Sequence, residues 1–388
     1  MKDVFIISDN IVSPLGFTSD DNFCQLRNNV SGIQQHTLPG LSPQPFYAAL
    51  LEQEQYKALF ESFDNTEACS RFEKLLIASV TNALQHTGIS IADPETVFIV
   101  SSTKGNIELL EKERTNPRLK EQIALHQSAK LVADYFNHTN MPVVISNACI
   151  SGLTALLTGK RLIESGQYKH AVVTGADLVS RFVLSGFQSF QAISETACKP
   201  FDASRNGINL GEAAGTIVLS CNKSSDTQVQ LTGGAVSNDA NHISGPSRSG
   251  QELCIAINKA LKQASISSED IGFISAHGTA TVYNDEMEAK AFSLAAMESI
   301  PVNSLKGFYG HTLGAAGIIE SVIAIQSLKQ DLVIPTIGFQ QTGVSKPINI
   351  CNKLLKISAD HCLKTASGFG GCNAALVFTK TVKQSIHS

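Results

Sequence analysis

Short apolar runs alternate with longer segments of helical period along most of the chain. The apolar runs predict buried strands, and the segments in which apolar residues recur every three or four positions predict helices. The expected strands are Val97–Ser101, Val143–Ser146, Ala171–Thr174, Gly272–Ala276 and Ala374–Thr379. The expected helices are Phe72–His86, Ser151–Ser165, Glu252–Ala264, Asp285–Met297 and Ala315–Lys329. Such alternation is typical of an α/β fold.

One helix–turn–strand pattern occurs twice. Leu75–Ser90 resembles Leu253–Ser267, and each copy leads into an expected strand. A weaker similarity joins Ser146–Gly166 to Asn303–Lys329. Coincidence between amphipathic helices is the alternative, but two similar segments that recur in the same order favour a duplication.

A duplication divides the chain into two halves, residues 1–227 and 228–388, packed about a pseudo-twofold axis. Such an axis brings equivalent strand ends of the two halves together. Ligand sites in α/β sheets lie beyond the carboxyl ends of the strands. We therefore expect a catalytic set drawn from both halves.

Composition excludes several classes of protein. The 388 residues are 43% apolar, and 30 Lys+Arg against 34 Asp+Glu give a net charge of −4. A non-specific nucleic-acid binder would carry a basic excess. No apolar run reaches the roughly 20 residues of a membrane span, and the N-terminus turns polar too soon for a secretory signal. We expect a cytoplasmic enzyme.

The nine cysteines are odd in number and include no CxxC pair, and no histidine stands at zinc-finger spacing. Buried thiols in a reduced compartment are the simplest account. Cys149 differs from the rest, since it follows the strand-like VVIS and precedes a helix. A helix N-terminus lowers a thiol pKa, and the order strand–turn–nucleophile–helix is that of a nucleophile elbow. Gly152 would let a substrate or a neighbouring helix approach closely.

Two histidines accompany this cysteine. His277 closes one strand and opens the string HGTAT, and His311 lies in the glycine-rich string KGFYGHTLGAAG. Each could be a satisfied core histidine, but with Cys149 they place three reactive groups at strand ends. Lys306 is the first residue of this second string and Glu320 follows its end, so the two flank the glycine-rich turn and could equally form a surface pair. The string SGFGGCN could present backbone N–H groups to an oxyanion.

Five strings occur in the order and spacing of the β-ketoacyl-ACP synthases: SNACISG, PFDASRNGINLGEAAG, AHGTATVYND, KGFYGHTLGAAG and SGFGGCN. The chain resembles the elongating condensing enzymes of type II fatty acid and polyketide synthesis, from about residue 4 to residue 380. The resemblance implies the thiolase fold, a duplicated five-layer α/β/α/β/α arrangement, and a homodimer. It also implies that the partner is acyl carrier protein (ACP), whose phosphopantetheine arm carries the substrates, and that no metal or other cofactor is needed.

The resemblance further assigns roles to residues. Cys149 would be the acylated nucleophile, and His277 and His311 would hydrogen-bond the thioester oxygen as malonyl-ACP loses carbon dioxide. Lys306 would support the second histidine electrostatically, and Glu320 would be a structural partner in that network.

The acyl substrate would meet four further residues. Thr279 and Thr281 match threonines that hydrogen-bond the phosphopantetheine arm. Phe369 matches a gating phenylalanine, and its N–H would join that of Cys149 as the oxyanion hole. Lys104 stands where the family has an apolar residue at the far end of the acyl pocket. A charge there favours a short, polar or unsaturated acyl chain, unless Lys104 extends to solvent or pairs across an interface.

Other departures from the family pattern are Asn206, Ile208 and Ala213 in its second string, Ala280, and Ser367 in place of a phenylalanine. Primary fatty acid synthesis and a specialised polyketide or polyene pathway both stay open. So does a subunit of a ketosynthase/chain-length-factor heterodimer, although non-catalytic partners lack the nucleophilic cysteine. A degradative thiolase is disfavoured because thiolases place a cysteine where this chain has its second histidine.

Overall fold

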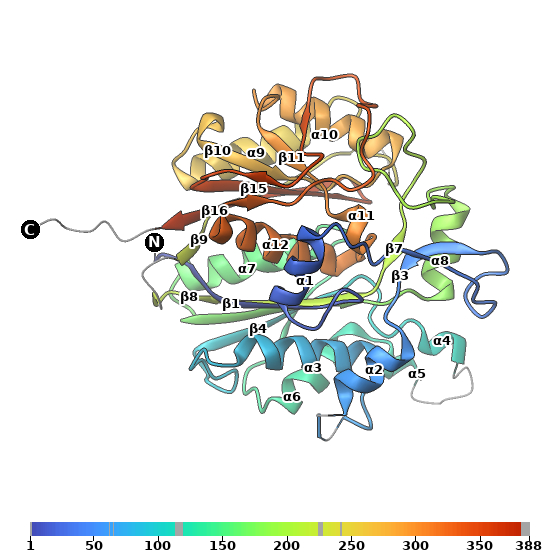
Figure 1. Cartoon of the computed structure of the whole chain (residues 1–388). Coiled ribbons are helices and arrows are strands. Elements are labelled where there is room, and N and C mark those ends of the chain that lie inside the picture. Colours follow the sequence, from blue (N-terminus) through green and yellow to red (C-terminus); the bar gives the residue numbers. More distant parts are fainter. Residues whose placement is uncertain are drawn as a thin grey trace, which may run out of the picture.

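The structure is a computed structural model that describes residues 2–61, 63–64, 66–112, 119–223, 228–240 and 243–381. Its helices and strands form five layers (Figure 1). Helices cover the outer faces of two β layers, and further helices lie between those layers. This is the duplicated α/β/α/β/α arrangement that the resemblance implied.

The two β layers belong to one hydrogen-bonded sheet of 11 strands that turns at the junction of β1 and β9. The first half contributes β1 (Phe5–Val12), β4 (Thr96–Ser101), β5 (Val143–Ile145), β6 (His170–Asp177) and β8 (Ala213–Ser220). The second half contributes β9 (Gln228–Asn238), β10 (Ile271–Ser275), β11 (Pro301–Asn303), β13 (Asn349–Ile350), β15 (His361–Gly368) and β16 (Cys372–Thr381).

The strand order shows the duplication directly. Outward from the junction, one half runs β1, β8, β6, β4, β5 and the other runs β9, β16, β15, β10, β11, with β13 added at the edge. In each half the order is therefore first, last, penultimate, second and third strand. The division of the chain after residue 227 stays a prediction, since residues 224–227 lie outside the described part.

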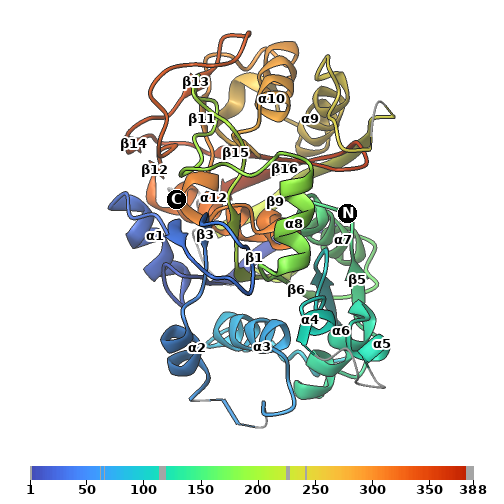
Figure 2. The same cartoon turned by 90° about the vertical axis from the view of Figure 1, so that its right-hand side faces the viewer.

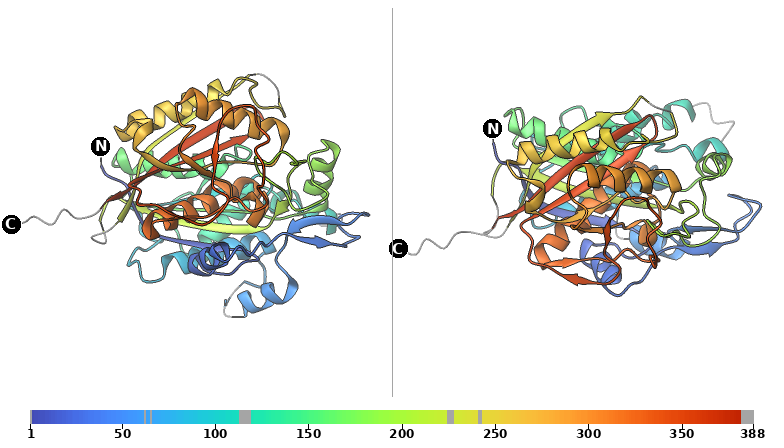
Figure 3. Two further views of the ribbon diagram at one scale, coloured as in Figure 1. Left: turned by 45° about the horizontal axis from the view of Figure 1, so that its top comes forward. Right: turned by 90° about the horizontal axis from the view of Figure 1, so that it is seen from above.

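The helices occupy equivalent places in the two halves. On the outer faces lie α3 (Arg71–Leu84), α6 (Leu125–Tyr135), α9 (Gln251–Ala264) and α10 (Val282–Leu294), and between the sheets lie α7 (Ser151–Glu164) and α12 (Ala316–Gln330). Figure 3 shows α9 and α10, in yellow and orange, lying over the red strands β15 and β16. Both copies of the predicted helix–strand repeat are present, as α3 followed by β4 and α9 followed by β10.

Shorter elements complete the chain. The helices are α1 (Ser19–Arg27), α2 (Gln53–Phe60), α4 (Leu109–Lys112), α5 (Leu119–Gln122), α8 (Arg181–Ser189) and α11 (Lys306–Tyr309), with 3-10 turns η1 (Ser268–Asp270) and η2 (Leu313–Ala315). The strands are β2 (Gln34–His36), β3 (Phe46–Ala49), β7 (Leu210–Gly211), β12 (Leu332–Val333) and β14 (Leu355–Lys356). Figure 2 looks onto the side of the molecule where α8 stands in front of the central layer.

The ends of the predicted elements have local causes. Helix α3 begins at a capping box, in which the Ser70 hydroxyl accepts from Glu73 N–H and the Glu73 carboxylate accepts from Ser70 N–H. Helix α10 begins three residues before its predicted start because Thr281 caps it, accepting the Asn284 N–H. Helix α12 is buried from Ala316 to Leu328, since sheets enclose it on both sides.

The central helices α7 and α12 approach closely at two glycines. A Cβ on Gly152 would lie 2.7 Å from the Ile318 nitrogen, and one on Gly317 would lie 2.7 Å from the Leu153 nitrogen. The close neighbour that Gly152 was predicted to admit is therefore helix α12.

All nine cysteines are free thiols. Among the helices of the described ranges, none has both the length and the hydropathy that crossing a membrane requires.

Candidate active site

Cys149 lies on a tight turn between β5 and α7. Ala148, directly before it, has a left-handed φ of 44°, which a residue with a side chain rarely adopts. The Ser151 hydroxyl closes this turn by donating to the Ala148 carbonyl at 2.6 Å and accepting from the Asn147 N–H at 2.8 Å. The predicted order of strand, turn, nucleophile and helix is thus present, and it holds the buried thiol beyond the carboxyl end of a strand.

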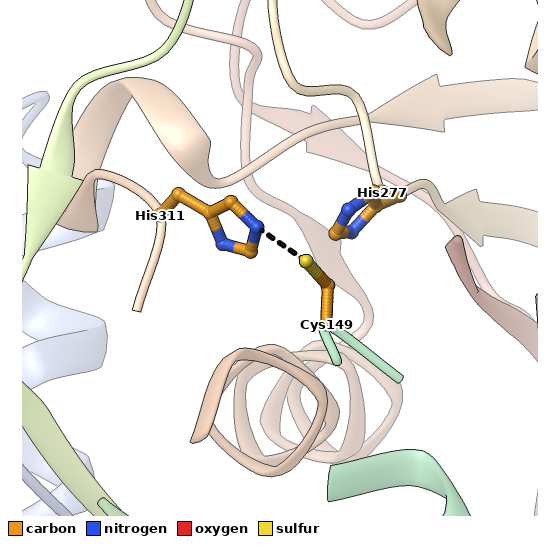
Figure 4. A group of neighbouring side chains, drawn as sticks. All are labelled: Cys149, His277 and His311. Carbon is orange, nitrogen blue, oxygen red and sulfur yellow. Dashed lines mark hydrogen bonds between the residues drawn. The ribbon is translucent and has the colours of Figure 1, made fainter. Parts of the chain in front are cut away.

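The two predicted histidines converge on this thiol from the second half of the chain (Figure 4). The Nε2 atom of His311 lies 3.1 Å from the Sγ atom of Cys149. One nitrogen of His277 completes a group whose three atoms lie within 4.8 Å of one another. The imidazole rings stand nearly perpendicular, at 82°, with centroids 5.2 Å apart.

Hydrogen bonds define which nitrogen of each ring carries a proton. The Leu313 N–H donates to Nδ1 of His311 at 3.3 Å, so the proton of the neutral ring is on Nε2, facing Cys149. The ammonium of Lys306 lies 3.5 Å from Nδ1 of His277. An ammonium can only donate, so His277 also carries its proton on Nε2. Both neutral imidazoles therefore act as N–H donors.

Burial keeps both rings neutral. It lowers the pKa of His277 well below the usual value, and the positive charges of Lys306 and Lys364 act in the same direction. Burial likewise lowers the pKa of His311, again with help from Lys306. At neutral pH the site holds two uncharged hydrogen-bond donors rather than two cations.

The thiol pKa differs from the sequence prediction. Burial raises the pKa of Cys149 to about 12, the neighbouring Cys372 adds to the increase, and Lys306 and the Phe369 N–H oppose it. The sequence alone predicts that the helix N-terminus lowers this pKa. Removal of the thiol from water outweighs that effect, so the resting thiol is protonated.

Lys306 and Glu320, which could have been a surface pair, are both buried and form an ion pair. Lys306 hydrogen-bonds His277, whereas the resemblance implies that it supports His311. Its charge nevertheless lowers the pKa of both rings. Lys306 therefore connects Glu320 to the histidine pair.

Two acidic residues that the sequence analysis did not select hold the His277 loop. The Glu288 carboxylate accepts the N–H groups of His277 at 2.9 Å and of Gly278 at 2.6 Å. Asp285 accepts the Thr279 N–H at 2.9 Å, and burial raises its pKa to about 7. Both residues lie on α10, directly after the HGTAT string. The sequence could have indicated them, because they are two carboxylates three residues apart on a helix that follows a loop with a candidate catalytic histidine.

A third missed residue, Asp177 at the end of β6, joins two loops. Its carboxylate accepts from the Ser102 hydroxyl at 2.8 Å, the Thr103 N–H at 3.0 Å and the Gly314 N–H at 2.7 Å. It is fully buried. Asp177 thereby ties the loop after β4 to the loop that follows His311.

The SGFGGCN loop passes beside the nucleophile. The Phe369 N–H acts to lower the pKa of the Cys149 thiol, and a Cβ on Gly368 would lie 2.9 Å from the Cys149 nitrogen. The Phe369 ring is 39% exposed and packs against Phe187 and Phe190, each with ring centroids 5.7 Å away. The two predicted oxyanion donors therefore lie close together.

A cavity of about 460 Å³ leads to these groups. Cys149, His277, His311, Thr279, Thr281 and Phe369 all line it, as do Asn206, Ile208 and Ser367, three of the departures from the family pattern. The hydroxyls of Thr279 and Thr281 lie 2.9 Å apart. Two other departures are buried away from the cavity lining, Ala213 in β8 and Ala280 at a left-handed φ of 63°.

Lys104 does not belong to the lining of this cavity. Its N–H donates to Asp177 at 3.2 Å, and its half-buried side chain places Nζ 3.5 Å from the Thr103 carbonyl. Contact with an acyl chain stays a prediction of the resemblance alone, and the position of Lys104 outside this cavity argues against it.

Cys149, His277 and His311 also form a possible metal-ligand set, since one sulfur and two nitrogens lie within 4.8 Å of one another. The Lys306 ammonium beside His277 opposes the binding of a further cation.

Comparison with known proteins now identifies the family. The N-terminal domain of β-ketoacyl synthases matches residues 1–224, and the C-terminal domain of the same family matches residues 229–340. The chain belongs to the β-ketoacyl synthase family.

Two relatives illustrate the range of this family. The 3-oxoacyl-[acyl-carrier-protein] synthase 2 of Vibrio harveyi is 27% identical over 415 residues, covering 97% of this chain and 98% of that protein. A putative polyketide β-ketoacyl synthase 1 of Streptomyces halstedii is 27% identical over 351 residues, covering 81% and 83% respectively.

Solved ketosynthase structures share the fold. A ketosynthase from Xenorhabdus doucetiae, solved in complex with its chain length factor, has a TM-score of 0.86 and 26% identity, covering 97% of this chain and 98% of that one. A β-ketoacyl synthase from Burkholderia phymatum has a TM-score of 0.87 and 24% identity, covering 98% and 100%. These similarities confirm the predicted thiolase fold for this ketosynthase.

Proposed function

We propose that this ketosynthase catalyses a decarboxylating Claisen condensation, joining an acyl group held on Cys149 to the two-carbon unit of malonyl-ACP to give β-ketoacyl-ACP. The observation that carries the proposal is the convergence of two neutral imidazoles on one buried thiol, with His311 Nε2 at 3.1 Å from Cys149 Sγ. The reaction needs a nucleophile that carries the acyl group and hydrogen-bond donors beside it, which the Cys149 thiol and the two imidazoles supply.

The first half-reaction loads the enzyme. The sulfur of Cys149 attacks the carbonyl carbon of acyl-ACP, and the N–H groups of Cys149 and Phe369 stabilise the oxyanion that develops. The bond to the phosphopantetheine sulfur breaks, and the proton of the Cys149 thiol ends on that leaving sulfur. Acyl-Cys149 and free ACP are the products. Because the resting thiol is protonated, loading depends on losing this proton during attack.

The second half-reaction begins with malonyl-ACP in the same cavity. The Nε2–H groups of His277 and His311 donate to its thioester oxygen, so that negative charge develops there as the carboxylate leaves as carbon dioxide. The enolate carbon then attacks the acyl-Cys149 carbonyl, the oxyanion donors act again, and the Cys149 sulfur leaves. One proton taken up by that sulfur restores the resting thiol.

The other groups in the site orient these donors. Lys306 donates a hydrogen bond to Nδ1 of His277, and the Leu313 N–H donates one to Nδ1 of His311. Both rings therefore keep their proton on Nε2 and act as donors from that atom. Glu320 compensates the charge of Lys306. No step requires a metal or an organic cofactor.

We assign the carrier by the chemistry of the cavity and by the relatives' names. A thioester on a long arm can pass between the hydroxyls of Thr279 and Thr281 and the ring of Phe369, all of which line the cavity. The relative from Vibrio harveyi is named for acyl carrier protein. Fatty acid synthesis and specialised polyketide synthesis both use this reaction.

The partner subunit is a second question, and a ketosynthase/chain-length-factor heterodimer is the alternative to a homodimer. The Xenorhabdus doucetiae ketosynthase, 26% identical, was solved with its chain length factor. In such a pair this chain would be the catalytic subunit, because Cys149 is present and contacts His311. Mixing the purified chain with ACP substrates, without any added partner, separates the two arrangements by whether it is active alone.

Intact-mass spectrometry tests the function directly. The chain is mixed with a panel of acyl-ACPs, and the wild type is compared with Cys149→Ala. An acyl adduct on the wild type that is absent from the variant, followed by formation of β-ketoacyl-ACP when malonyl-ACP is added, is the expected result. Loading of both proteins, or of neither with any donor, would contradict the proposal.

A further inference from the structure

Lys364 is a buried charged residue that the proposed reaction does not use. It stands in the middle of β15, and its side chain is completely buried. An ammonium removed from water is unfavourable unless partners satisfy its charge and its hydrogens. The partners of Lys364 therefore show what the fold has built around it.

Its ammonium joins two parts of the active site. Nζ donates to the carbonyls of Thr365 at 2.7 Å, Ser275 at 3.1 Å and Ala276 at 3.2 Å. Ser275 ends β10, and Ala276 directly precedes His277. Nζ also forms an ion pair with Oε2 of Glu320 at 2.8 Å. One cation thus fastens the strand end that carries His277 to helix α12.

Glu320 consequently lies between two ammonium groups. Lys306 contacts its Oε1, and Lys364 contacts its Oε2. All three side chains are buried. Because both carboxylate oxygens form ion pairs, Glu320 cannot rotate without breaking one of them. The fixed Glu320 carboxylate in turn holds the Lys306 ammonium in its position beside His277.

Thr365, which follows Lys364 on β15, is also connected to His277, through Glu288. The Thr365 hydroxyl donates to Glu288 at 3.0 Å, and Glu288 accepts the His277 N–H at 2.9 Å. The charged groups facing Lys364 are Glu320, Lys306 and Glu288. Burial lowers the pKa of Lys364, whereas the two carboxylates oppose that shift.

We propose that Lys364 is a positioning residue for the decarboxylation step, holding Glu320 and the end of β10 so that Lys306 and His277 stay aligned. The inference rests on the proposed function, in which His277 donates to the malonyl thioester oxygen. Lys364 does not touch substrate. It acts through Lys306 and through the backbone before His277.

The two half-reactions separate this role from a purely structural one. Loading uses the Cys149 thiol and the oxyanion N–H groups, whereas decarboxylation needs the Nε2–H of His277. Loss of Lys364 should therefore slow carbon dioxide release from malonyl-ACP much more than acylation of Cys149. The positive charge of Lys364 also contributes to the lowered pKa of His277. Removing Lys364 should therefore raise that pKa, and the fall of the decarboxylation rate at acid pH (the acid limb of the pH–rate profile) should begin at a higher pH.

The test compares Lys364→Met with Lys160→Met. Lys160 is another buried lysine, paired with Glu164 at 2.5 Å on helix α7, and it serves as the matched control for losing a buried cation. For Lys364→Met we expect carbon dioxide release to fall by about tenfold or more while acyl loading stays within about threefold, with the acid limb displaced upward. Lys160→Met should change both half-reactions equally and leave the pH profile in place.

Lys364→Arg keeps the positive charge on a larger group. If Lys364→Met fails to fold, Lys364→Arg tests whether Lys364 is a positioning residue. It should retain the wild-type pH profile and lose decarboxylation selectively, by less than Lys364→Met. Equal loss of both half-reactions in the folded variants, or an unmoved acid limb for Lys364→Met, would overturn the proposal. Failure of the wild type to load acyl groups and release carbon dioxide would instead contradict the proposed function.

Discussion

Cys149 and His311 come from opposite halves of the chain, yet Sγ of the first lies 3.1 Å from Nε2 of the second. Each residue precedes one of the two central helices, α7 after Cys149 and α12 after His311. The pseudo-twofold arrangement places these helices side by side between the sheets. The contact between Cys149 and His311 therefore depends on how closely α7 and α12 approach.

Substitution at that crossing should disturb both stability and activity. In Gly317→Ala the added Cβ would stand 2.7 Å from the Leu153 nitrogen, a backbone atom that cannot rotate away. We expect a loss of about 1–3 kcal/mol in the free energy of unfolding, since overpacking forces the backbone apart. Denaturant unfolding measures it, together with Cys149 acylation. The control is Gly186→Ala in α8, where a Cβ would meet nothing within 4 Å. Equal stability of the two variants would show that the helices can separate freely.

Alkylation of Cys149 should report the raised thiol pKa. With a pKa of about 12, the thiolate fraction at Cys149 should rise about tenfold for each pH unit up to pH 10. The rate of iodoacetamide addition, followed by peptide mass spectrometry, should rise accordingly without a plateau. Cys24, an exposed cysteine in α1, provides the reference in the same sample. A plateau near neutral pH would mean that the helix N-terminus dominates after all.

The decarboxylation rate should be nearly constant across neutral pH. The pKa of both His277 and His311 is depressed by burial, so the rings are neutral donors above their own pKa and become protonated only as the pH falls through it. The rate of carbon dioxide release should therefore decline only well below pH 6.5. An acid limb centred at pH 6.5 or above would show that the imidazoles are hydrated in solution.

Replacing His311 should separate the two half-reactions. His311→Ala removes one of the two donors to the malonyl thioester oxygen, and loss of one such donor typically costs about 10²–10³-fold. Carbon dioxide release should fall by that amount, while acyl loading of Cys149 falls less. His126→Ala, on the exposed surface of α6, is the matched control and should behave as the wild type. A variant that decarboxylates at the normal rate would assign the donor role elsewhere.

Lys104 offers a test of acyl specificity. Because its side chain does not line the cavity and extends toward the Thr103 carbonyl, Lys104→Ile should leave the ranking of acyl-ACP chain lengths unchanged. Competition between short and long acyl-ACPs, read by intact mass, measures the ranking. A shift toward long saturated chains would place Lys104 against the acyl group, as the sequence comparison first suggested.

The chain by itself determined most of the helices and strands and the candidates for the reactive groups. The spacing of apolar residues predicted α3, α9 and the buried strands. The repeated helix–turn–strand pattern predicted the two halves. Cys149, His277 and His311 could be selected because glycine-rich turns and strand ends are local features that a short string records. These properties depend on neighbours along the chain.

Only the tertiary structure decided the electrostatics. Lys306 hydrogen-bonds His277 rather than His311, Lys364 shares Glu320, and the pKa of Cys149 rises although a helix begins beside it. Charge interactions and desolvation depend on which groups five packed layers bring within a few ångströms and how completely they exclude water. Residues far apart in sequence, such as Lys364 and Glu320, meet only when both halves have closed around the central helices.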